Sequence, residues 1–514
     1  MAKSSTTSED VKIVISLFCC VSGIGTLGMP GNFSRAGPIL GTAALIFMAF
    51  ANIYASVACS KVMLRAPAHV KTLGDLGQWC SGTIGRHTVQ ISQMAVCLLT
   101  TCVFLELGGD MLNSLFPATF SKTFWIIFMA VSVSPLCLKP TLKEGAGVAL
   151  AGCAGTIIAD VLALILLLGG MSGHPPTPQP ELNFDQIAGA FGNLSLAYAA
   201  AVLIPSLQIE HSKPERMPFL IGATLSVVTV MFFAIAATGY SAVGCQISGN
   251  LLFSVFPDPR TGLSVLGFRP HKGIAVLAYL AMQMHVTIAF SVFLHPTFYM
   301  LERLLLGMHQ PKIAETPYYN LETSSGQMHE ICVTPERIEA NIQSCPIISE
   351  HESTFVEEEE EYGSSRNALK YVALRLTLVA LLVITSIIFQ NRINEFADFT
   401  DFTGASFITI SCIVLPIIFY LQKLWKEIPY WEKAAAIIVL LVCGILGSYE
   451  TYTSGRDLIV PSTDKPDFPF CRPELEDTLY YNATAVQLSR LVDLPLQLNY
   501  NDQVTFGKAL SVES

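Results

Sequence analysis

The chain has 514 residues and a net charge of −10, and 52% of its residues are hydrophobic while only 14% are charged. Together with a mean hydropathy of +0.51, this composition excludes an ordinary soluble domain and predicts an all-α integral membrane protein that has the lipid bilayer as a partner. The acidic excess lies in residues 302–370, with 13 acids and 5 bases, and in residues 454–514, with 9 acids and 5 bases. Because the rest of the chain is close to neutral, we expect no nucleic-acid partner.

Eleven apolar segments come close to the roughly 20 residues that a helix needs to cross a bilayer. We therefore expect about 11 transmembrane helices. The predicted divisions are a cytosolic segment 1–11, helices 1–8 in 12–301, a cytosolic and disordered acidic loop 302–369, helices 9–11 in 370–453, and a tail 454–514. The eleven segments are 12–30, 38–60, 90–113, 123–138, 147–170, 187–209, 219–243, 273–301, 370–389, 404–422 and 433–453.

Lys and Arg residues in the short connections predict the orientation of these helices, because cytosolic connections are enriched in both. With the N-terminus in the cytosol, the inner connections hold eleven such residues and the outer connections hold six. An odd number of spans then makes the C-terminal tail extracellular or lumenal. The pattern fits the plasma membrane and a vacuolar or lysosomal membrane equally.

The first predicted span contains "GIGTLGMP", Gly23 to Pro30, which is poorly suited to the interior of a helix. Non-helical backbone at membrane depth is tolerated where it lines a cavity or is buried in protein. Transporters use such breaks to present free N–H groups to an anion and free carbonyls to a cation. Close helix packing or a proline kink is the alternative, but three glycines just before a proline favour a binding site. The candidate residues are Gly23, Gly25, Thr26, Leu27 and Gly28.

Four ionisable side chains fall at bilayer depth in other spans, where a charge is costly and functional by default. Glu106 and Asp110 lie one turn apart in the third span, Asp160 lies in the fifth, and His285 lies in the eighth. A histidine or a desolvated acid can carry a coupled proton, whereas a sodium site would use first-helix carbonyls and hydroxyls of the eighth span. We predict proton coupling over sodium coupling. The candidate residues are Glu106, Asp160, His285, Thr287 and Ser291.

Each of these ionisable residues also has a structural interpretation. Asp110 is expected at the outer boundary, where it is solvated or caps a helix. Glu106 and Asp160 are alternatively paired structural groups, and His285 is alternatively a hydrogen-bonded packing residue.

An inverted repeat of five plus five helices requires a second interrupted span in the sixth position. The sixth segment, which includes "AFGNLSLAYAAAVLIP", has small and polar residues followed by Pro205. The eleventh helix is then an addition at the C-terminal end. The candidate residues of the sixth span are Gly192, Asn193, Ser195 and Tyr198.

These segments resemble the amino acid/auxin permease family, whose LeuT-like inverted-repeat fold has discontinuous helices 1 and 6. The resemblance runs from about Val11 to Leu305, and more weakly through the last three spans. It depends on five motifs in order: "SGIGTLGMPGNFSRAG", "TLGDLGQWCSGTIGR", "LELGGDMLNSLFP", "FGNLSLAYAAAVLIP" with the following "HSKPERMP", and "HPTFYMLERLL".

The resemblance implies a substrate carboxylate on the amides of Gly25 to Gly28 and an amine that faces the break in the sixth helix. It also implies that Tyr198, at a position often occupied by Phe, packs against the side chain of the substrate. Many members have a glycine pair where this chain has Ala199 to Ala201. Because alanine favours helix, we expect the second break to be shorter or to move toward Gly192.

Cys245 and Cys471 fall in segments placed outside the cytosol, where a pair of cysteines can be oxidised. A disulfide between them is therefore a hypothesis. Asn482, which begins the sequence Asn-Ala-Thr, is a possible glycosylation site on the same side. No spacing of Cys and His predicts a metal site, and we expect no cofactor.

The function predicted from these features is a secondary active transporter that moves amino acids by alternating access, driven by a proton or sodium gradient. An amino-acid-sensing receptor on the same fold, signalling through the acidic loop, is the alternative. We expect no enzymatic activity, because "LGGD", ending at Asp110, lacks the first glycine of the G-x-G-D motif of membrane aspartyl proteases. The sequence specifies neither the amino acid nor an oligomeric state.

Overall fold

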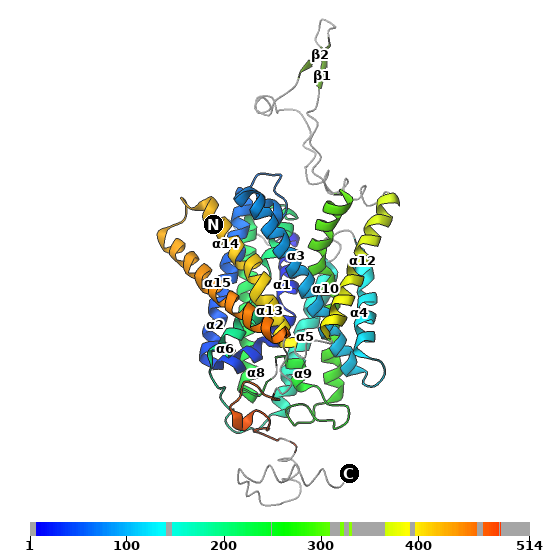
Figure 1. The fold of residues 1–514 in the computed structure, drawn as a ribbon, viewed down its shortest axis with the longest axis vertical. Coiled ribbons are helices and arrows are strands. Elements are labelled where there is room, and N and C mark those ends of the chain that lie inside the picture. Colours follow the sequence, from blue (N-terminus) through cyan, green and yellow to red (C-terminus); the bar gives the residue numbers. More distant parts are fainter. Residues whose placement is uncertain are drawn as a thin grey trace, which may run out of the picture.

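The computed structural model describes residues 7–139, 146–247, 249–308, 319–322, 328–331, 365–390, 396–459, 466–482 and 484. The described chain forms a bundle of helices (Figure 1), which confirms the predicted all-α membrane fold. Nine of the described helices are long and apolar enough to cross a membrane. The helices are α1 (Ser8–Val21), α2 (Ile24–Arg65), α3 (Leu73–Leu115), α4 (Lys122–Cys137), α5 (Ala146–Gly170), α6 (Phe184–Ala197), α7 (Ile204–Ile209), α8 (Met217–Val243), α9 (Leu251–Val255), α10 (Lys272–Leu301), α12 (Ser365–Gln390), α13 (Phe396–Thr403), α14 (Leu415–Leu424) and α15 (Tyr430–Ile459).

Shorter elements connect or extend these helices. Three are 3₁₀ turns: η2 (Ala201–Leu203), η3 (Pro214–Arg216) and η7 (Pro473–Leu475). Two are π-helical: η4 (Glu302–Leu306) continues α10, and η6 (Gly404–Val414) joins α13 to α14.

Helices α2 and α3 are interrupted by glycines. They have 42 and 43 residues, about twice the length that a bilayer requires. Gly37 in α2 and Gly82 in α3 have φ angles of 71° and 67°, a region of backbone conformation that favours glycine. The first predicted span comprises α1 and the start of α2, and the second lies in the stretch of α2 after Gly37. The count of eleven crossings stays a prediction, because it depends on how the interrupted helices are counted.

The two ends of the bundle carry different segments (Figure 1). The antiparallel strands β1 (Tyr319–Glu322) and β2 (Met328–Ile331) lie beyond one end, which we call the hairpin face. The segment around η7 lies at the opposite end, which we call the tail face. The predicted disorder of loop 302–369 concerns residues that lie mainly outside the described ones.

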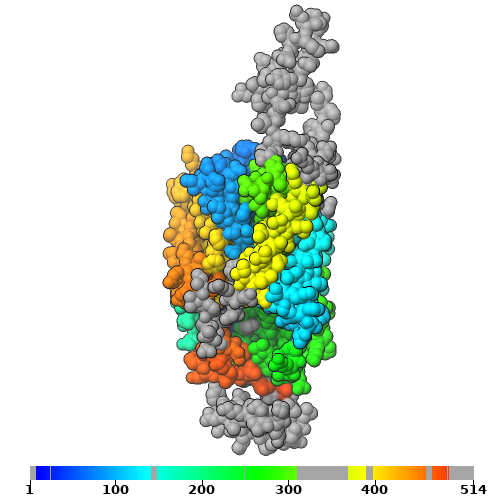
Figure 2. All heavy atoms as spheres, turned by 45° about the vertical axis from the view of Figure 1, so that its right-hand side comes forward, coloured from blue at the N-terminus to red at the C-terminus, as the bar shows by residue number. Residues whose placement is uncertain are grey.

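The bundle consists mainly of two groups of helices. α2 packs along α6 and α8, whereas α3 and α4 contact each other and both contact α10 and α12. Figure 2 shows α12 in yellow beside α4 in cyan on one side of the molecule. The apolar side chains of both groups share one continuous core. Large apolar side chains such as Ile39, Ile84 and Phe219 are 82%, 81% and 74% exposed, as is expected of a surface that lipid covers.

The described part of the tail is fixed against the tail face. A disulfide joins Cys471 to Cys245, which follows α8. The Gln246 side chain makes three hydrogen bonds with backbone groups of residues 475–480. Asn482, the possible glycosylation site, is half-buried next to this attachment.

A buried ion pair joins three helices near the hairpin face. Arg375 Nε donates to Glu302 Oε1 at 2.6 Å, and its Nη1 donates to the carbonyls of Cys137 and Lys139. The side chains of Arg375 and Glu302 are 1% and 0% exposed. The pair therefore connects α12 with the ends of α4 and α10.

We predict that Glu302→Gln lowers the free energy of unfolding by about 3–5 kcal/mol, because it removes the carboxylate with which the buried Arg375 pairs. Asp457→Asn is the control, since it breaks the exposed Arg456–Asp457 pair and should cost less than about 1 kcal/mol. Thermal unfolding of the purified protein in detergent measures both variants. Equal losses would show that the buried pair contributes no more than a surface pair.

Candidate functional site

The first helix break occupies Ser22 and Gly23. Ser22 is extended (φ −86°, ψ 116°), Gly23 is also non-helical (φ 173°, ψ −114°), and α2 begins directly afterwards. The break is shorter than the predicted one, since Gly25 to Pro30 are helical. Apart from Thr26, whose N–H bonds to the carbonyl of Gly23 at 3.1 Å, the N–H groups of the first turn of α2 have no partner within the helix.

Gly25 lies in the first turn of α2, where a helix has no carbonyl of its own to pair with the backbone N–H. Leu27 and Gly28 lie further along α2, where N–H groups pair with carbonyls of the same helix. The expectation that the amides of Gly25 to Gly28 act as one anion site therefore includes two residues, Leu27 and Gly28, whose N–H groups are used within the helix. The N-terminus of α2 also carries the positive end of its helix dipole, which favours a negative group at the break.

The second helix break lies within the alanine run of the sixth span. α6 ends at Ala197, Tyr198 leaves the helix (φ −103°, ψ 23°), and η2 leads into α7. The expected move toward Gly192 is wrong, because Gly192 lies inside α6. Pro205 accounts for this position: its missing N–H and its ring disrupt the helical hydrogen bond to the carbonyl four residues earlier, which outweighs the helix preference of the alanines.

The two broken helices touch at their glycines. A Cβ on Gly25 would lie 2.6 Å from the Cβ of Ala197, and a Cβ on Gly28 would lie 2.7 Å from the side-chain amide of Asn193. Asn193 also accepts a hydrogen bond from Asn32 at 3.0 Å. The glycines therefore allow α2 and α6 to approach closely at the same depth as the breaks, so the packing alternative and the binding-site interpretation apply to the same residues.

Three other candidates of the sixth span contact neighbouring helices. Gly192 lies against the backbone of α13, where an added Cβ would meet a carbonyl oxygen at 2.4 Å. Ser195 accepts a hydrogen bond from Thr409 at 3.3 Å, and the Tyr198 hydroxyl lies 2.8 Å from Thr229 Oγ1. Tyr198 is completely buried and packs against α8.

Asp160 and His285 meet at the first break. The Thr26 hydroxyl lies 2.7 Å from the Gly23 carbonyl oxygen and 3.2 Å from Asp160 Oδ1. Asp160 is 3% exposed, and its Oδ2 has no hydrogen-bond partner within the described part of the chain. His285 is 1% exposed, and a Cβ on Gly23 would lie 2.1 Å from its Nε2. Side chains from α5 and α10 and the backbone of the break therefore form one buried polar cluster.

The hydrogen bond of His285 indicates which ring nitrogen carries the hydrogen. Nδ1 lies 3.1 Å from the carbonyl oxygen of Gly152, so a neutral ring carries its hydrogen on Nδ1 and leaves Nε2 as an acceptor that faces Gly23. Among the residues that the structure describes, no three His, Cys, Asp or Glu side chains are grouped to hold a metal ion. The cluster thus pairs a carboxylate that has an unpaired oxygen with an imidazole that has an accepting nitrogen.

The remaining coupling candidates lie apart from this cluster. Glu106 and Asp110 both pair with Lys122 Nζ, at 3.0 and 2.8 Å. The hydroxyls of Thr287 and Ser291 donate to carbonyls of their own helix, α10, each at 2.8 Å. The surroundings of Glu106 thus resemble those of a paired structural group.

An ion pair that the sequence analysis missed lies on the tail side of the breaks. Arg35 on α2 pairs with Asp401 on α13 at 2.5 Å, and the two side chains are 7% and 4% exposed. The Arg35 guanidinium also lies 4.9 Å from the ring centre of Phe470 in the tail. Arg35 is one of the six basic residues that the orientation argument places in the outer connections. Its position within the first-helix motif was the only sequence signal for a role of Arg35. The pairing itself could not be predicted, because Asp401 lies 366 residues away.

A second missed cluster lies on the hairpin side of the breaks. Asp10, which precedes the predicted first span, accepts from His211 Nε2 and Arg216 Nη1, both at 2.9 Å, and is completely buried. The hydrogen bond from the backbone N–H of Thr7, together with His211 and Arg216, lowers the pKa of Asp10 to about 2. The carboxylate is therefore ionised at physiological pH and holds α1 against the segment that follows α7.

A small cavity lies along α1 between the Asp10 cluster and the first break. Its volume is 50 Å³, room for one or two water molecules. It separates α1 from α7. These two helices are the parts of the broken helices that lie on the hairpin side of the breaks. The lining residues are Ser16, Cys19, Cys20, Ala149, Leu203, Ser206, Leu207, Glu210 and Val292.

Known proteins share both the sequence pattern and the arrangement. The family described as "Transmembrane amino acid transporter protein" matches residues 6–453. Amino acid transporter ANT1 of Arabidopsis thaliana is 20% identical over 88% of this chain and 94% of its own length. Amino acid transporter AVT1I of the same plant is 25% identical over 50% of this chain and 65% of its own length. Vacuolar amino acid transporter 7 of Saccharomyces cerevisiae is 22% identical over 51% of this chain and 54% of its own length.

Solved structures share the fold. The crystal structure of MhsT in complex with L-phenylalanine superposes with a TM-score of 0.52 at 11% identity, covering 86% of this chain and 98% of MhsT. A crystal structure of the manganese transporter of Eremococcus coleocola gives a TM-score of 0.51 at 10% identity and covers 96% of both chains. These likenesses confirm the predicted LeuT-like fold and nothing finer.

We predict that Asp10→Asn speeds the reaction of Cys20 with a water-soluble maleimide by about fivefold or more, the equivalent of roughly 1 kcal/mol. The reason is that the Asp10 carboxylate holds α1 against His211 and so closes the hairpin side of the cavity. The substitution removes this charge. Peptide mass spectrometry of the labelled protein measures the rate. Asp258→Asn, in an exposed loop of the tail face, is the control and should change nothing. An unchanged rate in Asp10→Asn would show that the cluster does not control access to the cavity.

Proposed function

The chain belongs to the transmembrane amino acid transporter protein family, and from this premise we propose that it carries amino acids across a membrane in symport with protons. The observation that carries the proposal is the meeting of two helix breaks with Asp160 and His285 in one buried cluster. Such breaks are the binding sites of transporters built from inverted repeats.

An amino acid offers a carboxylate and an ammonium group, and the two breaks supply opposite partners for them. The first turn of α2 has free N–H groups and the positive end of the helix dipole, which suit the carboxylate. The last turn of α6 has carbonyls without helical partners, which suit the ammonium group. We assign substrate contact to Gly23, Gly25 and Thr26, and support of the helices around it to Leu27, Gly28, Gly192, Asn193, Ser195 and Tyr198.

Asp160 is placed to bind the coupled proton. Its Oδ2 has no partner in the described ranges, and an unpaired carboxylate at this depth is costly unless a proton or a cation neutralises it. His285 supplies a second acceptor, Nε2, at Gly23. Thr287 and Ser291, whose hydroxyls would be needed by a sodium site, donate to their own helix, which supports proton over sodium coupling.

Alternating access requires the two sides of the site to open in turn. We assign the closing of the hairpin side to the Asp10 cluster and the closing of the tail side to the Arg35–Asp401 pair, both of which are formed in this structure. The close contact of Gly25 with Ala197 leaves no room for a ligand, so binding requires the two helix ends to separate. Opening of either closure allows that movement.

We assign the hairpin face to the cytosol, because Lys and Arg concentrate in the connections of that side. The acidic loop 302–369 is then cytosolic, and the tail 454–514, with its disulfide, is extracellular or lumenal. The membrane proposed is the plasma membrane or a vacuolar or lysosomal membrane.

We predict that proteoliposomes containing the protein accumulate amino acids when a pH gradient is imposed, without a requirement for sodium. Asp160→Asn should lower proton-driven accumulation by at least about tenfold, because an amide cannot bind and release the proton. Exchange of internal for external substrate should persist in this variant. Radiolabelled uptake of an amino-acid panel under separate proton and sodium gradients measures these effects.

Asp258→Asn is the control for this experiment, since it removes an exposed carboxylate far from the breaks and should leave uptake unchanged. Uptake that ignores pH but disappears without sodium would reverse the choice of ion. Binding without translocation would assign the protein to the receptor class instead.

A further inference from the structure

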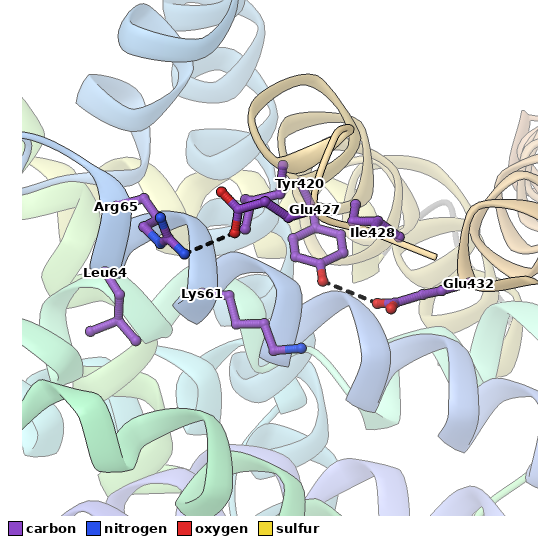
Figure 3. Close-up of a pocket in the computed structure, with 8 residues that line it drawn as sticks. Lys61, Leu64, Arg65, Tyr420, Glu427, Ile428 and Glu432 are labelled. Atoms are coloured by element: carbon purple, nitrogen blue, oxygen red, sulfur yellow. Dashed lines mark hydrogen bonds and ion pairs between the residues drawn. The ribbon is translucent and has the colours of Figure 1, made fainter. Parts of the chain in front are cut away.

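A larger cavity lies on the hairpin face, away from the helix breaks. It occupies the place where the end of α2 meets the end of α14 and the start of α15 (Figure 3). Its volume is 370 Å³, within the roughly 300–1,000 Å³ that is typical of ligand sites. Because the site proposed for the transported amino acid lies at the breaks, this cavity has no role in that mechanism.

Charges of both signs line this cavity. Arg65 pairs with Glu427 at 2.8 Å, and the Tyr420 hydroxyl donates to Glu432 at 3.0 Å. Lys61 forms no ion pair with a carboxylate in the described residues, and its ammonium lies 5.6 Å from the centre of the Tyr420 ring. Figure 3 shows the Lys61 side chain extending from α2 toward Tyr420 and Glu432. The cavity therefore offers an uncompensated ammonium on one wall and a carboxylate on another.

The cavity lies at the level where a bilayer meets water. It is formed at the ends of three helical segments that are each long enough to cross a membrane. Trp425, Tyr430 and Trp431, in and beside the connection between α14 and α15, are 49%, 89% and 74% exposed. Exposed Trp and Tyr at helix ends are typical of the membrane interface, where lipid headgroups lie.

An aromatic and apolar track leads from the cavity along α2 into the membrane. The Tyr54 ring lies edge-on to Tyr420 and stacks on Phe50, with ring centres 6.0 Å apart in both contacts. Phe50 is 50% exposed, and Ile46, one helical turn further, is 61% exposed. Because residues four apart share one face of a helix, these side chains form a continuous surface below Lys61.

We propose that this cavity binds the headgroup of a zwitterionic phospholipid of the phosphoethanolamine type. The phosphate lies on Lys61 and Arg65, the primary ammonium donates to Glu432, and an acyl chain covers Phe50 and Ile46. The headgroup brings one negative and one positive charge to a cavity that presents both. Its phosphate neutralises Lys61, which, unlike Arg65 in the same lining, has no carboxylate partner among the described residues.

Other ligands fit this arrangement less well. A purely anionic headgroup would leave Glu432 and Glu427 facing a negative charge, which is unfavourable. A choline headgroup has no N–H to donate to Glu432. A free amino acid has the required charges but lacks the chain that covers the track along α2.

Native mass spectrometry of the full-length protein tests the proposal. The protein is stripped of lipid and titrated with phosphatidylethanolamine, phosphatidylcholine or phosphatidylglycerol of identical acyl chains. We expect phosphatidylethanolamine to bind first and most tightly. Lys61→Gln should weaken binding of the first phosphatidylethanolamine by about fivefold, the effect typical of one basic residue at a membrane surface.

Two further variants separate this site from general attraction to the interface. Lys433→Gln is the matched control, because Lys433 lies at the same level over the rings of Trp425 and Tyr430 and outside the cavity lining. It should bind the first lipid as the unchanged protein does. Glu432→Gln should abolish the preference for phosphatidylethanolamine over phosphatidylcholine. Equal binding of all three lipids, an equal loss in Lys433→Gln, or displacement of the lipid by millimolar glycine would each overturn the proposal.

Discussion

The backbone of a membrane-spanning helix must satisfy its hydrogen bonds within the helix, and this protein interrupts that pattern in two helices that touch each other. Ser22 and Gly23 separate α1 from α2, and the chain from Tyr198 to Leu203 separates α6 from α7. Side chains pair with the released carbonyls: Thr26, in the first turn of α2, donates to Gly23, and Gln93, on α3, donates to Val202. The interruption is stable because it is buried in protein, and it is useful because free amides remain at the start of α2.

The distribution of buried charge distinguishes the coupling cluster from its surroundings. Glu106, Asp401 and Glu302 each have a basic partner within 3.0 Å, so their charges are compensated within the fold. Asp160 has no basic partner within the described chain, and its side chain has only a hydroxyl contact at 3.2 Å. Since an uncompensated carboxylate is costly inside a membrane, its neutralisation is the event by which an ion gradient can act on the site.

The sequence was sufficient to predict the helical membrane fold and the location of the first break, because long apolar segments and a glycine cluster before a proline are local signals. For the second break the helix preference of Ala199 to Ala201, also a local signal, left two alternatives, a shorter break or a shift toward Gly192. The structure excludes the shift, because Pro205 outweighs that preference. The pairs Arg35–Asp401 and Asp10–His211 could not be predicted, since their partners lie 366 and 201 residues apart. Such pairing depends on tertiary packing, which one sequence does not reveal.

The most direct test of the account is whether main-chain groups at the two breaks bind the charged ends of the substrate. For an amino acid that the protein transports, its carboxamide and its N-acetyl derivative should compete for uptake at least about tenfold more weakly than the unmodified molecule, because each loses a charged partner for the breaks. Competition by the carboxamide as strong as that of the unmodified amino acid would contradict the account, because the free amides at the start of α2 would then have no carboxylate to bind.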